Sequence, residues 1–221
     1  MTQVVTTINE VKSIRKAVLK EKSVGFVPTM GALHAGHAEL MKQARKENDY
    51  VIVSIFVNPT QFDNTADLEK YPSTIESDIQ MAEKQTVNCV WMPKFAQIYP
   101  DQYKYKVAET ELSKLLCGEH RPGHFDGMLT VVMRLLNIIK PTRAYFGEKD
   151  YQQLTLVRGM VQAFFIDTQI VGIPTVREPN GLAMSSRNSR LSPADKEKAP
   201  LLYKIISQSP SDSEAKRQLE D

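Results

Sequence analysis

Short apolar runs alternate with stretches of helical periodicity along most of the chain. The apolar runs predict strands at residues 24–27, 51–57, 88–92, 144–146 and 168–173. The second of them is almost continuously apolar and β-branched, as expected of a strand that is covered on both faces. Apolar residues at helical spacing lie between the runs, and one long segment of this kind covers 125–139. Strands that alternate with helices predict an α/β fold, with a Rossmann-like, largely parallel sheet and helices on both faces.

Polar residues mark where several of the helices begin. Thr7-Ile8-Asn9-Glu10 and Ser73-Thr74-Ile75-Glu76 match the capping-box pattern, and Ser192-Pro193 is typical of a helix start. From Ser207 onward the sequence is polar, which predicts a mobile tail.

The composition is that of an ordinary globular chain, and it excludes several classes of protein. The 221 residues suffice for one large domain, or for one domain with a small appendage. A formal charge of +2, without a block of Lys or Arg, gives no footprint for nucleic acid. No apolar run approaches the roughly 18 residues of a membrane span, and the N-terminus lacks a secretory pattern. Because Cys89 and Cys117 form no disulfide framework, we expect a cytoplasmic protein.

Residues 28–37 join the first predicted strand to a helix. Their sequence, Pro-Thr-Met-Gly-Ala-Leu-His-Ala-Gly-His, places two glycines and two histidines at a strand–turn–helix junction. Free backbone N–H groups and the positive end of the helix dipole make such a junction an anion site. Gly31 and Gly36 leave room for a ligand, and His34 and His37 lie on one side of the helix start. These features predict a phosphate site, with ATP as the expected ligand.

Two further loops follow predicted strands directly and carry groups suited to the same site. Gln61 comes after the second predicted strand, and Lys149 comes after the fourth. The carboxyl ends of parallel strands meet at one edge of a sheet, so we expect these side chains and both histidines to converge there. The polar segment 177–190 is either a flexible loop or a mobile lid that donates hydroxyl groups and a guanidinium to a triphosphate.

The same residues have simpler interpretations. His34 and His37 are also typical of helix capping, and Lys149 in a Gly-Glu-Lys-Asp turn is typical of a solvated surface. The histidines fall into two pairs, with Cys117 near the second pair, which leaves a zinc site open. Only the spacing Cys117-Gly-Glu-His120 supports zinc, and the glycine-containing junction favours the phosphate site.

Five segments of the chain carry a resemblance to a known family. They are residues 28–37, 56–62, 121–125, 146–153 and 184–188. The first contains the His-x-Gly-His signature of nucleotidyltransferases related to class I aminoacyl-tRNA synthetases, which is moderately specific on its own. Together and in this order, the segments resemble the pantothenate synthetase (pantoate–β-alanine ligase) family within that superfamily. The resemblance extends from about residue 24 to residue 191, and the five segments together are highly specific.

This resemblance implies a two-step reaction. ATP and pantoate give pantoyl adenylate and pyrophosphate, and β-alanine then displaces AMP to form pantothenate, a coenzyme A precursor. ATP, pantoate and β-alanine are the implied substrates, Mg²⁺ is expected with ATP although its ligands are unassigned, and the family implies a homodimer. Two alternatives stay open: a non-catalytic nucleotide-binding module left by C-terminal truncation, and a related nucleotidyltransferase with another product. Gln61 and Gln153, amides suited to a small polyol acid, argue against the second.

The resemblance also implies roles for individual residues. His37 is expected to donate a proton or stabilise phosphate, with His34 beside it on ATP and Lys149 in contact with both ATP and pantoate. Gln61 and Gln153 are expected to orient pantoate through its hydroxyl groups and carboxylate. The remaining residues implied for ATP binding, which include a counterpart of the synthetases' Lys-Met-Ser-Lys loop, are Met30, Gly36, Gly147, Asp150, Val176, Met184, Ser185, Ser186 and Arg187.

The chain departs from the family pattern in two places. Ser73 follows Tyr-Pro where family members usually carry Arg, which puts in doubt a contact near the pantoate side or the dimer surface. The part after Leu191 is shorter than the family's C-terminal lid domain, so we expect a truncated lid and impaired closure over ATP. The expected division is a Rossmann-like nucleotide- and pantoate-binding domain at 1–176, then a mobile phosphate loop and truncated lid at 177–221.

Overall fold

Six strands of the described chain pair into one sheet, and each pairing between neighbours is parallel. The structure is a computed structural model that describes residues 1–18 and 22–220. The strands follow the order β1-β4-β3-β2-β5-β6 across the sheet. Their bounds are β1 Gln3–Val5, β2 Val24–Thr29, β3 Tyr50–Ile55, β4 Cys89–Trp91, β5 Arg143–Gly147 and β6 Gln169–Ile173. The predicted parallel α/β sheet is confirmed.

The edge strand β1 was not predicted from the apolar pattern. It contains three residues and pairs with β4, with Val4 opposite Val90. The Thr2 hydroxyl donates a hydrogen bond to the Val87 carbonyl at 2.7 Å and ties the N-terminus to the chain before β4. A run this short gives no periodicity, because its position depends on a partner that is distant in sequence.

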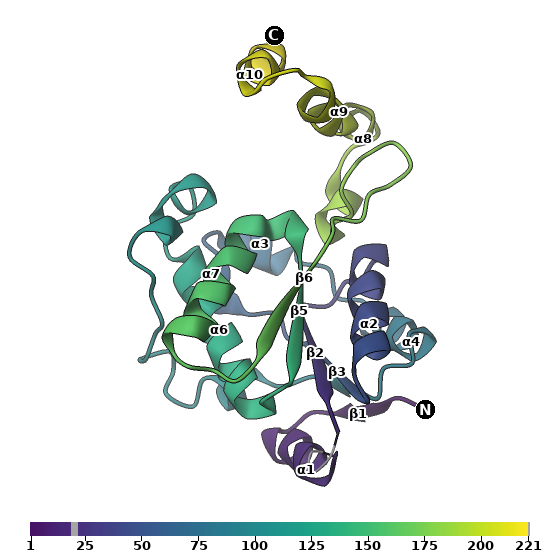
Figure 1. The fold of residues 1–221 in the computed structure, drawn as a ribbon, viewed down its shortest axis with the longest axis vertical. Coiled ribbons are helices and arrows are strands. Elements are labelled where there is room, and N and C mark those ends of the chain that lie inside the picture. Colours follow the sequence, from purple (N-terminus) through teal and green to yellow (C-terminus); the bar gives the residue numbers. More distant parts are fainter. Residues whose placement is uncertain (19–21, 221) are drawn as a thin grey trace.

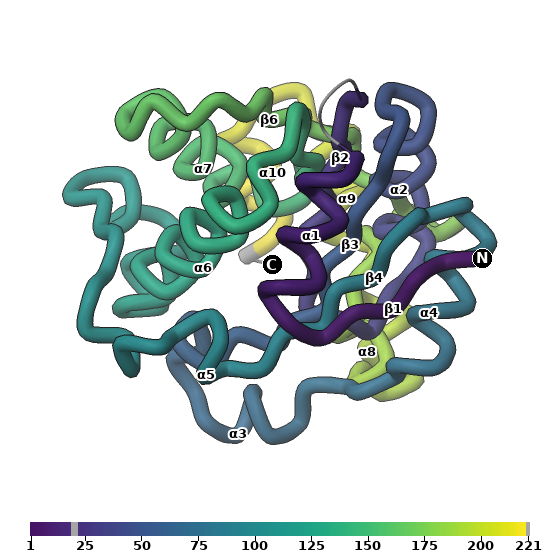
Figure 2. The backbone as a smooth tube through the Cα atoms, turned by 90° about the horizontal axis from the view of Figure 1, so that it is seen from below, coloured from purple at the N-terminus to yellow at the C-terminus, as the bar shows by residue number. Residues whose placement is uncertain are grey.

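The central strands are buried on both faces, as their apolar sequences predict. In β3, Ile52 belongs to one core, whereas its neighbours Val51 and Val53 belong to the other. This alternation follows from the two-residue repeat of a strand. Helices α1, α6 and α7 contribute to the first core, and α2 and α4 contribute to the second. Figure 1 and Figure 2 show α6 and α7 on one side of the strands and α2 and α4 on the other.

Helices and 3-10 turns fill the connections between strands. The α-helices are α1 Ile8–Val18, α2 Ala35–Glu47, α3 Thr65–Glu69, α4 Ile75–Lys84, α5 Phe95–Ile98, α6 His124–Ile139, α7 Tyr151–Ala163, α8 Pro193–Lys198, α9 Pro200–Gln208 and α10 Asp212–Glu220. The 3-10 turns are η1 Pro59–Gln61, η2 Leu112–Lys114, η3 Leu116–Gly118, η4 Glu148–Asp150 and η5 Ser186–Arg190. None of the helices in the described ranges has the length and apolar character needed to cross a membrane.

The predicted helix starts agree with the structure at two of three positions. At α1, the Thr7 and Glu10 side chains each accept a hydrogen bond from the other residue's backbone N–H, so this capping box is confirmed. At α8, the Ser192 hydroxyl accepts from the Asp195 backbone N–H at 3.1 Å. The capping box at Ser73 is wrong, because α4 begins after Thr74. The Thr74 hydroxyl donates instead to the buried Asp78 carboxylate.

The strand order creates a topological switch point between β2 and β5. The chain leaves β2 for α2 on one face of the sheet and leaves β5 for α7 on the other. A crevice forms at the carboxyl ends of two strands whose connections diverge in this way, and α/β proteins bind ligands there. The loops after β2 and β5 carry the predicted histidines and Lys149, so the topology alone brings them to one place.

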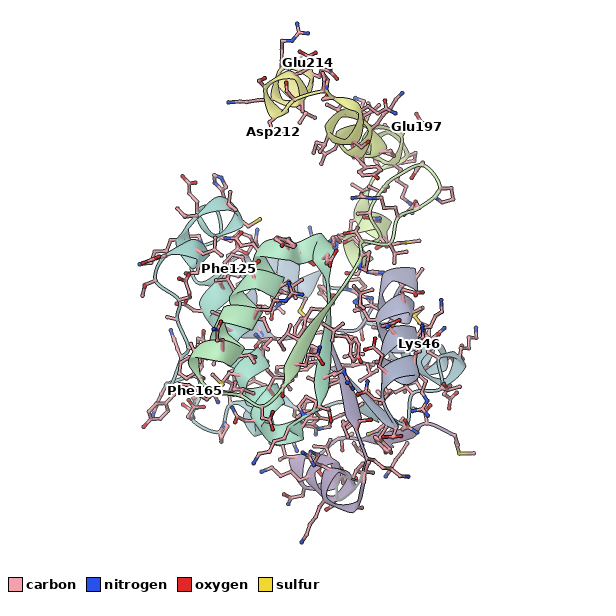
Figure 3. The ribbon with its side chains drawn as sticks, viewed as in Figure 1. Lys46, Phe125, Phe165, Glu197, Asp212 and Glu214 are labelled. Carbon is pink, nitrogen blue, oxygen red and sulfur yellow. The ribbon has the colours of Figure 1, made fainter. Side chains whose placement is uncertain are left out.

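The chain after β6 leaves the sheet at this same edge. It passes through η5 into helices α8, α9 and α10, which rise beyond the sheet in Figure 1. Figure 3 shows Glu197, Asp212 and Glu214 on these helices, apart from the body that contains Phe125. The predicted mobile tail contains a helix, α10 at Asp212–Glu220, in which Glu214 pairs with Arg217 at 2.9 Å. Its mobility stays a prediction. The proposed division at residue 176 stays a prediction, and its last residue, Asp221, lies outside the described residues.

Candidate active site

The turn between β2 and α2 is held by a buried carboxylate from another helix. Asp78 of α4, only 2% exposed, accepts hydrogen bonds from the backbone N–H groups of Ala32 and Leu33 at 2.9 and 2.8 Å. Gly31 before them has a φ of +80°, which a residue with a side chain adopts at a cost. Asp78 therefore fixes the turn that leads into α2, although it lies 46 positions after Ala32 in the chain.

His34 and His37 cap the helix that carries them. The Nδ1 atom of His34 accepts from the Gly36 backbone N–H at 3.1 Å, and the Nδ1 atom of His37 accepts from the His34 backbone N–H at 3.2 Å. The interpretation of these residues as helix caps is therefore correct. A backbone N–H can only donate, so in each neutral ring the single proton lies on Nε2. Capping leaves both imidazoles as Nε2–H donors.

Both rings are neutral at physiological pH. Burial lowers the pKa of His37 from 6.5 to about 3, with smaller contributions from the charges of His34 and Lys149. Burial also lowers the pKa of His34, again with a contribution from Lys149. The ring centroids are 4.1 Å apart, so one protonated ring would repel the other. A bound phosphate would favour protonation, because it adds negative charge beside the rings.

Gly36 is required by the position of the His34 ring. A Cβ atom at residue 36 would lie 2.9 Å from Cε1 of His34. Any other residue would displace the ring, so the glycine of the His-x-Gly-His sequence allows His34 to fold over the first turn of α2.

A chain of hydrogen bonds orients the Gln61 side chain at the second loop. The Tyr99 hydroxyl donates to Oδ1 of the buried Asn58 at 2.8 Å. The Nδ2 atom of Asn58 therefore faces Oε1 of Gln61, to which it donates at 3.1 Å. The Nε2 group of Gln61 is left beside the sulfur of Met30, at 3.2 Å. An occupied oxygen and an available N–H make Gln61 a donor toward a ligand.

Helix α6 supports the backbone of the same loop. The Nδ1–H of His124 donates to the Gln61 carbonyl at 2.7 Å, and the Arg121 guanidinium donates to the other ring nitrogen at 3.1 Å. A Cβ atom at Gly127 would lie 2.1 Å from the Thr60 carbonyl oxygen. This close approach explains why residue 127 is a glycine.

The third loop presents Lys149 in η4, just before α7. Its ammonium lies 3.3 Å from the neighbouring Asp150 carboxylate, and its side chain is 38% exposed. Its charge lowers the pKa of both His34 and His37, and it lines the same cavity as these two rings. The adjacent glutamines of α7 differ in role. Gln152 donates to the carbonyls of Leu112 and Leu115, whereas Gln153 lines the cavity described next.

One cavity joins these loops to the segment after β6. Its walls contain every residue that was predicted for the site: Met30, His34, Gly36, His37, Gln61, Gly147, Lys149, Asp150, Gln153, Val176, Met184, Ser185, Ser186 and Arg187. The predicted convergence is therefore confirmed as geometry. The roles of these residues stay predictions.

Sequence reasoning missed other residues of the cavity wall. Asn58 and Tyr71 add polar groups to it. Val132, in the long apolar helix, lies in both the core and the cavity wall. The full additional set is Pro28, Thr29, Leu40, Phe56, Asn58, Tyr71, Met128, Val131, Val132, Leu135, Tyr145, Phe146, Ile173, Pro174 and Thr175. Helical periodicity cannot distinguish a core residue from one that also borders a cavity.

The zinc alternative finds no support in the geometry. Within residues 1–18 and 22–220, no group of three or more His, Cys, Asp or Glu side chains could hold a metal ion. His124 contacts the Gln61 carbonyl and Arg121, and Cys117 is an exposed free thiol.

Comparisons with known proteins agree with the fold. A sequence model of the family described as pantoate–β-alanine ligase matches residues 3–221. The chain is 57% identical to a pantothenate synthetase of Bdellovibrio bacteriovorus over 97% of this chain and 85% of the relative. It is 49% identical to one from Legionella pneumophila, over 99% of this chain and 86% of that relative. A crystal structure of the Francisella tularensis pantoate–β-alanine ligase, complexed with β,γ-ATP and β-alanine, superposes with a TM-score of 0.93 at 45% identity, covering 100% of this chain and 85% of that one.

Proposed function

Since the chain belongs to the pantoate–β-alanine ligase family, we infer that the cavity at the β2–β5 switch point is where it joins pantoate to β-alanine with ATP. The observation that supports this most is the meeting of His34, His37, Gln61 and Lys149 around one cavity. These groups come from three loops far apart in sequence. Together they supply donors for phosphate and for a small hydroxy acid.

The first step forms pantoyl adenylate. A pantoate carboxylate oxygen attacks the α-phosphorus of ATP, and the bond from that phosphorus to the bridging oxygen breaks as pyrophosphate leaves. The phosphate oxygens gain negative charge in this step, and preorganised donors stabilise it. We propose that the Nε2–H groups of His34 and His37 and the ammonium of Lys149 provide those donors. We assign His37 to phosphate stabilisation as a neutral donor, because burial lowers its pKa to about 3.

The second step forms the amide. The β-alanine nitrogen attacks the acyl carbon, the bond from that carbon to the AMP oxygen breaks, and the nitrogen loses a proton. In both steps pantoate must be held against the phosphorus and then against the amine. We assign this positioning to Gln61, whose amide orientation is set by the hydrogen bond from Asn58, and to Gln153.

The nucleotide is proposed to occupy the part of the cavity between the loops after β2, β5 and β6. Its wall there is formed by Met30, Gly36, Gly147, Asp150, Val176, Met184, Ser185, Ser186 and Arg187. Mg²⁺ is proposed to accompany ATP, because this ion binds phosphate oxygens with one or two carboxylates. Asp150 is the carboxylate that the described cavity wall offers for this purpose.

We further propose a homodimer in the cytoplasm, as the family resemblance implies. Cys89 and Cys117 are both free thiols, which suits a reducing compartment. Residues 1–176 and 177–221 are proposed to work as two units, with the substrate loops in the first and the phosphate loop in the second. Analytical ultracentrifugation tests the dimer directly, since a single species of 25.0 kDa would contradict it.

Product analysis tests the proposed function. The chain is incubated with ATP, pantoate and β-alanine, and pantothenate, AMP and ADP are measured by liquid chromatography. One AMP should appear for each pantothenate, without ADP. Binding of ATP without pantothenate, even at high enzyme concentration, would favour the non-catalytic module instead. A product from another alcohol or nucleotide in a substrate panel would favour the related nucleotidyltransferase.

A further inference from the structure

One carboxylate beside the cavity joins two segments of the chain that are far apart in sequence. Asp67 in α3 pairs with Arg187, at 2.7 Å, and with Arg190, at 2.5 Å. Both arginines belong to η5, about 120 positions further along the chain. Two guanidinium groups that converge on one carboxylate form a small network, in which each partner restricts the others.

Further contacts tie the same two segments together. Nη2 of Arg190 donates to the Lys70 carbonyl at 2.6 Å. The hydroxyl groups of Tyr71 and Ser186 lie 3.3 Å apart, and the Arg187 guanidinium lies over the Tyr71 ring at 5.7 Å from its centroid. Because Tyr71, Ser186 and Arg187 all line the cavity, these contacts close one side of it.

The arginine nearest the cavity is held by one edge of its planar group. Nε and Nη2 of Arg187 both donate to Asp67, at 3.4 and 2.7 Å. In the described part of the chain, no group accepts a hydrogen bond from Nη1 of Arg187. Arg187 lines the cavity and Asp67 does not, so the carboxylate contacts the guanidinium from outside the wall. The edge that Asp67 leaves available has the geometry and charge to bind a phosphate oxygen.

The carboxylate keeps its charge at neutral pH. Hydrogen bonds from Arg187, and then from Arg190, lower the pKa of Asp67 to about 2 in spite of partial burial. Ion pairs near the surface contribute little to folding stability. The larger effect of this pair is therefore on the orientation of the Arg187 side chain.

We propose that Asp67 is a positioning residue for ATP binding, which holds Arg187 by one edge and, through Arg190, fixes η5 against α3. The proposal rests on the proposed function, because it assumes that the cavity binds ATP. Arg187 contacts the nucleotide, and Asp67 acts only through Arg187.

The test compares Asp67→Asn with a matched control. Asparagine has the shape of aspartate without its charge, and Glu69→Gln removes one charge from an exposed position of the same helix. The Kd of Mg-ATP is measured by calorimetry, and the KM values of ATP and pantoate are measured in steady state. Asp67→Asn should weaken ATP binding on the order of tenfold, the scale of one charge-assisted hydrogen bond. The KM of pantoate and kcat should stay within about threefold, and Glu69→Gln should match the unaltered protein.

Two further variants separate positioning from folding. Asp67→Glu keeps the charge and should recover most of the ATP affinity. In an Arg187→Gln background, Asp67→Asn should change the Kd of ATP by less than about twofold, because partners in one interaction are not additive. Additive losses would overturn the proposal, since Asp67 would then act without Arg187.

The sign of the effect is also decisive. If Asp67→Asn binds ATP as well as the unaltered protein, or more tightly, the proposal is wrong, and tighter binding would mean that Asp67 competes with phosphate. If the unaltered protein binds ATP but forms no pantothenate, the proposed function fails. In that case the calorimetric comparison still decides the role of Asp67.

Discussion

His37 combines two functions in one ring, and two substitutions can separate them. Its Nδ1 atom accepts a hydrogen bond from the His34 backbone, and its Nε2–H is the donor assigned to phosphate. Asparagine places an oxygen near the position of Nδ1 and has no group at Nε2. Glutamine places an NH₂ group near Nε2. His37→Asn should therefore keep the helix cap and lose the phosphate donor, and His37→Gln should do the reverse.

The expected magnitudes follow from these two contacts. Loss of one preorganised donor costs about 2.7–4 kcal/mol of transition-state stabilisation, so His37→Asn should lower the adenylation rate by at least about 100-fold. Loss of a helix cap costs about 0.5–2 kcal/mol of folding free energy. The free energy of unfolding of His37→Asn should therefore lie within about 0.5 kcal/mol of that of the unaltered protein. His37→Ala should lose both the adenylation rate and roughly 1 kcal/mol of unfolding free energy.

The assay is pantoate-dependent exchange of labelled pyrophosphate into ATP, with urea unfolding of each variant as the control for stability. His37→Gln should retain a rate within about tenfold of the unaltered protein, because it keeps a donor. Near-normal exchange by His37→Asn, with its fold intact, would refute the assigned role. A large loss of rate in His37→Gln together with normal exchange in His37→Asn would show that only the cap matters.

Three other perturbations test separate parts of the site. Lys149→Ala should lower the exchange rate by at least about 100-fold, as expected for the loss of a charged donor, and normal exchange would remove Lys149 from the mechanism. Asn58→Asp places an oxygen against Oε1 of Gln61, so the Gln61 amide should rotate. The KM of pantoate should then rise about tenfold, while the KM of ATP stays constant. Equal changes in both KM values would contradict this orientation of Gln61. Burial lowers the pKa of His37 from 6.5 to about 3, so the unfolded chain binds one proton more than the folded one between these values, and stability is lost as the pH falls below 6.5. At pH 5 this loss amounts to about 2 kcal/mol of unfolding free energy, and His37→Asn should abolish it. If the unaltered protein and His37→Asn show the same pH dependence of unfolding, His37 does not titrate in this way.

The sequence predicted the fold and the cavity well where local pattern decides the structure. The apolar runs at 51–57 and 144–146 become β3 and β5, and the residues that follow them reach the same cavity. A parallel sheet has one carboxyl edge, so loops after its strands meet whatever their distance in sequence. Gly36 is also explained by local sequence, because the His34 ring that it accommodates lies only two positions away.

The residues that were missed act across long distances in the chain. Asp78 fixes the turn before His34 from another helix, and Asp67 contacts arginines of η5. No local periodicity marks such a carboxylate, since an acidic residue on a short or amphipathic helix is usually solvated. The hydrogen-bond chain Tyr99–Asn58–Gln61 also cannot be predicted from the sequence, because it depends on which amide atom faces which partner.

In the proposed reaction, one cavity holds ATP and pantoate together so that the acid attacks the nucleotide. Exchange of labelled pyrophosphate into ATP, measured with and without pantoate and before any β-alanine is added, tests it most directly. We predict exchange that requires pantoate and saturates with its concentration. Exchange that is equal with and without pantoate, or that requires β-alanine, would contradict it.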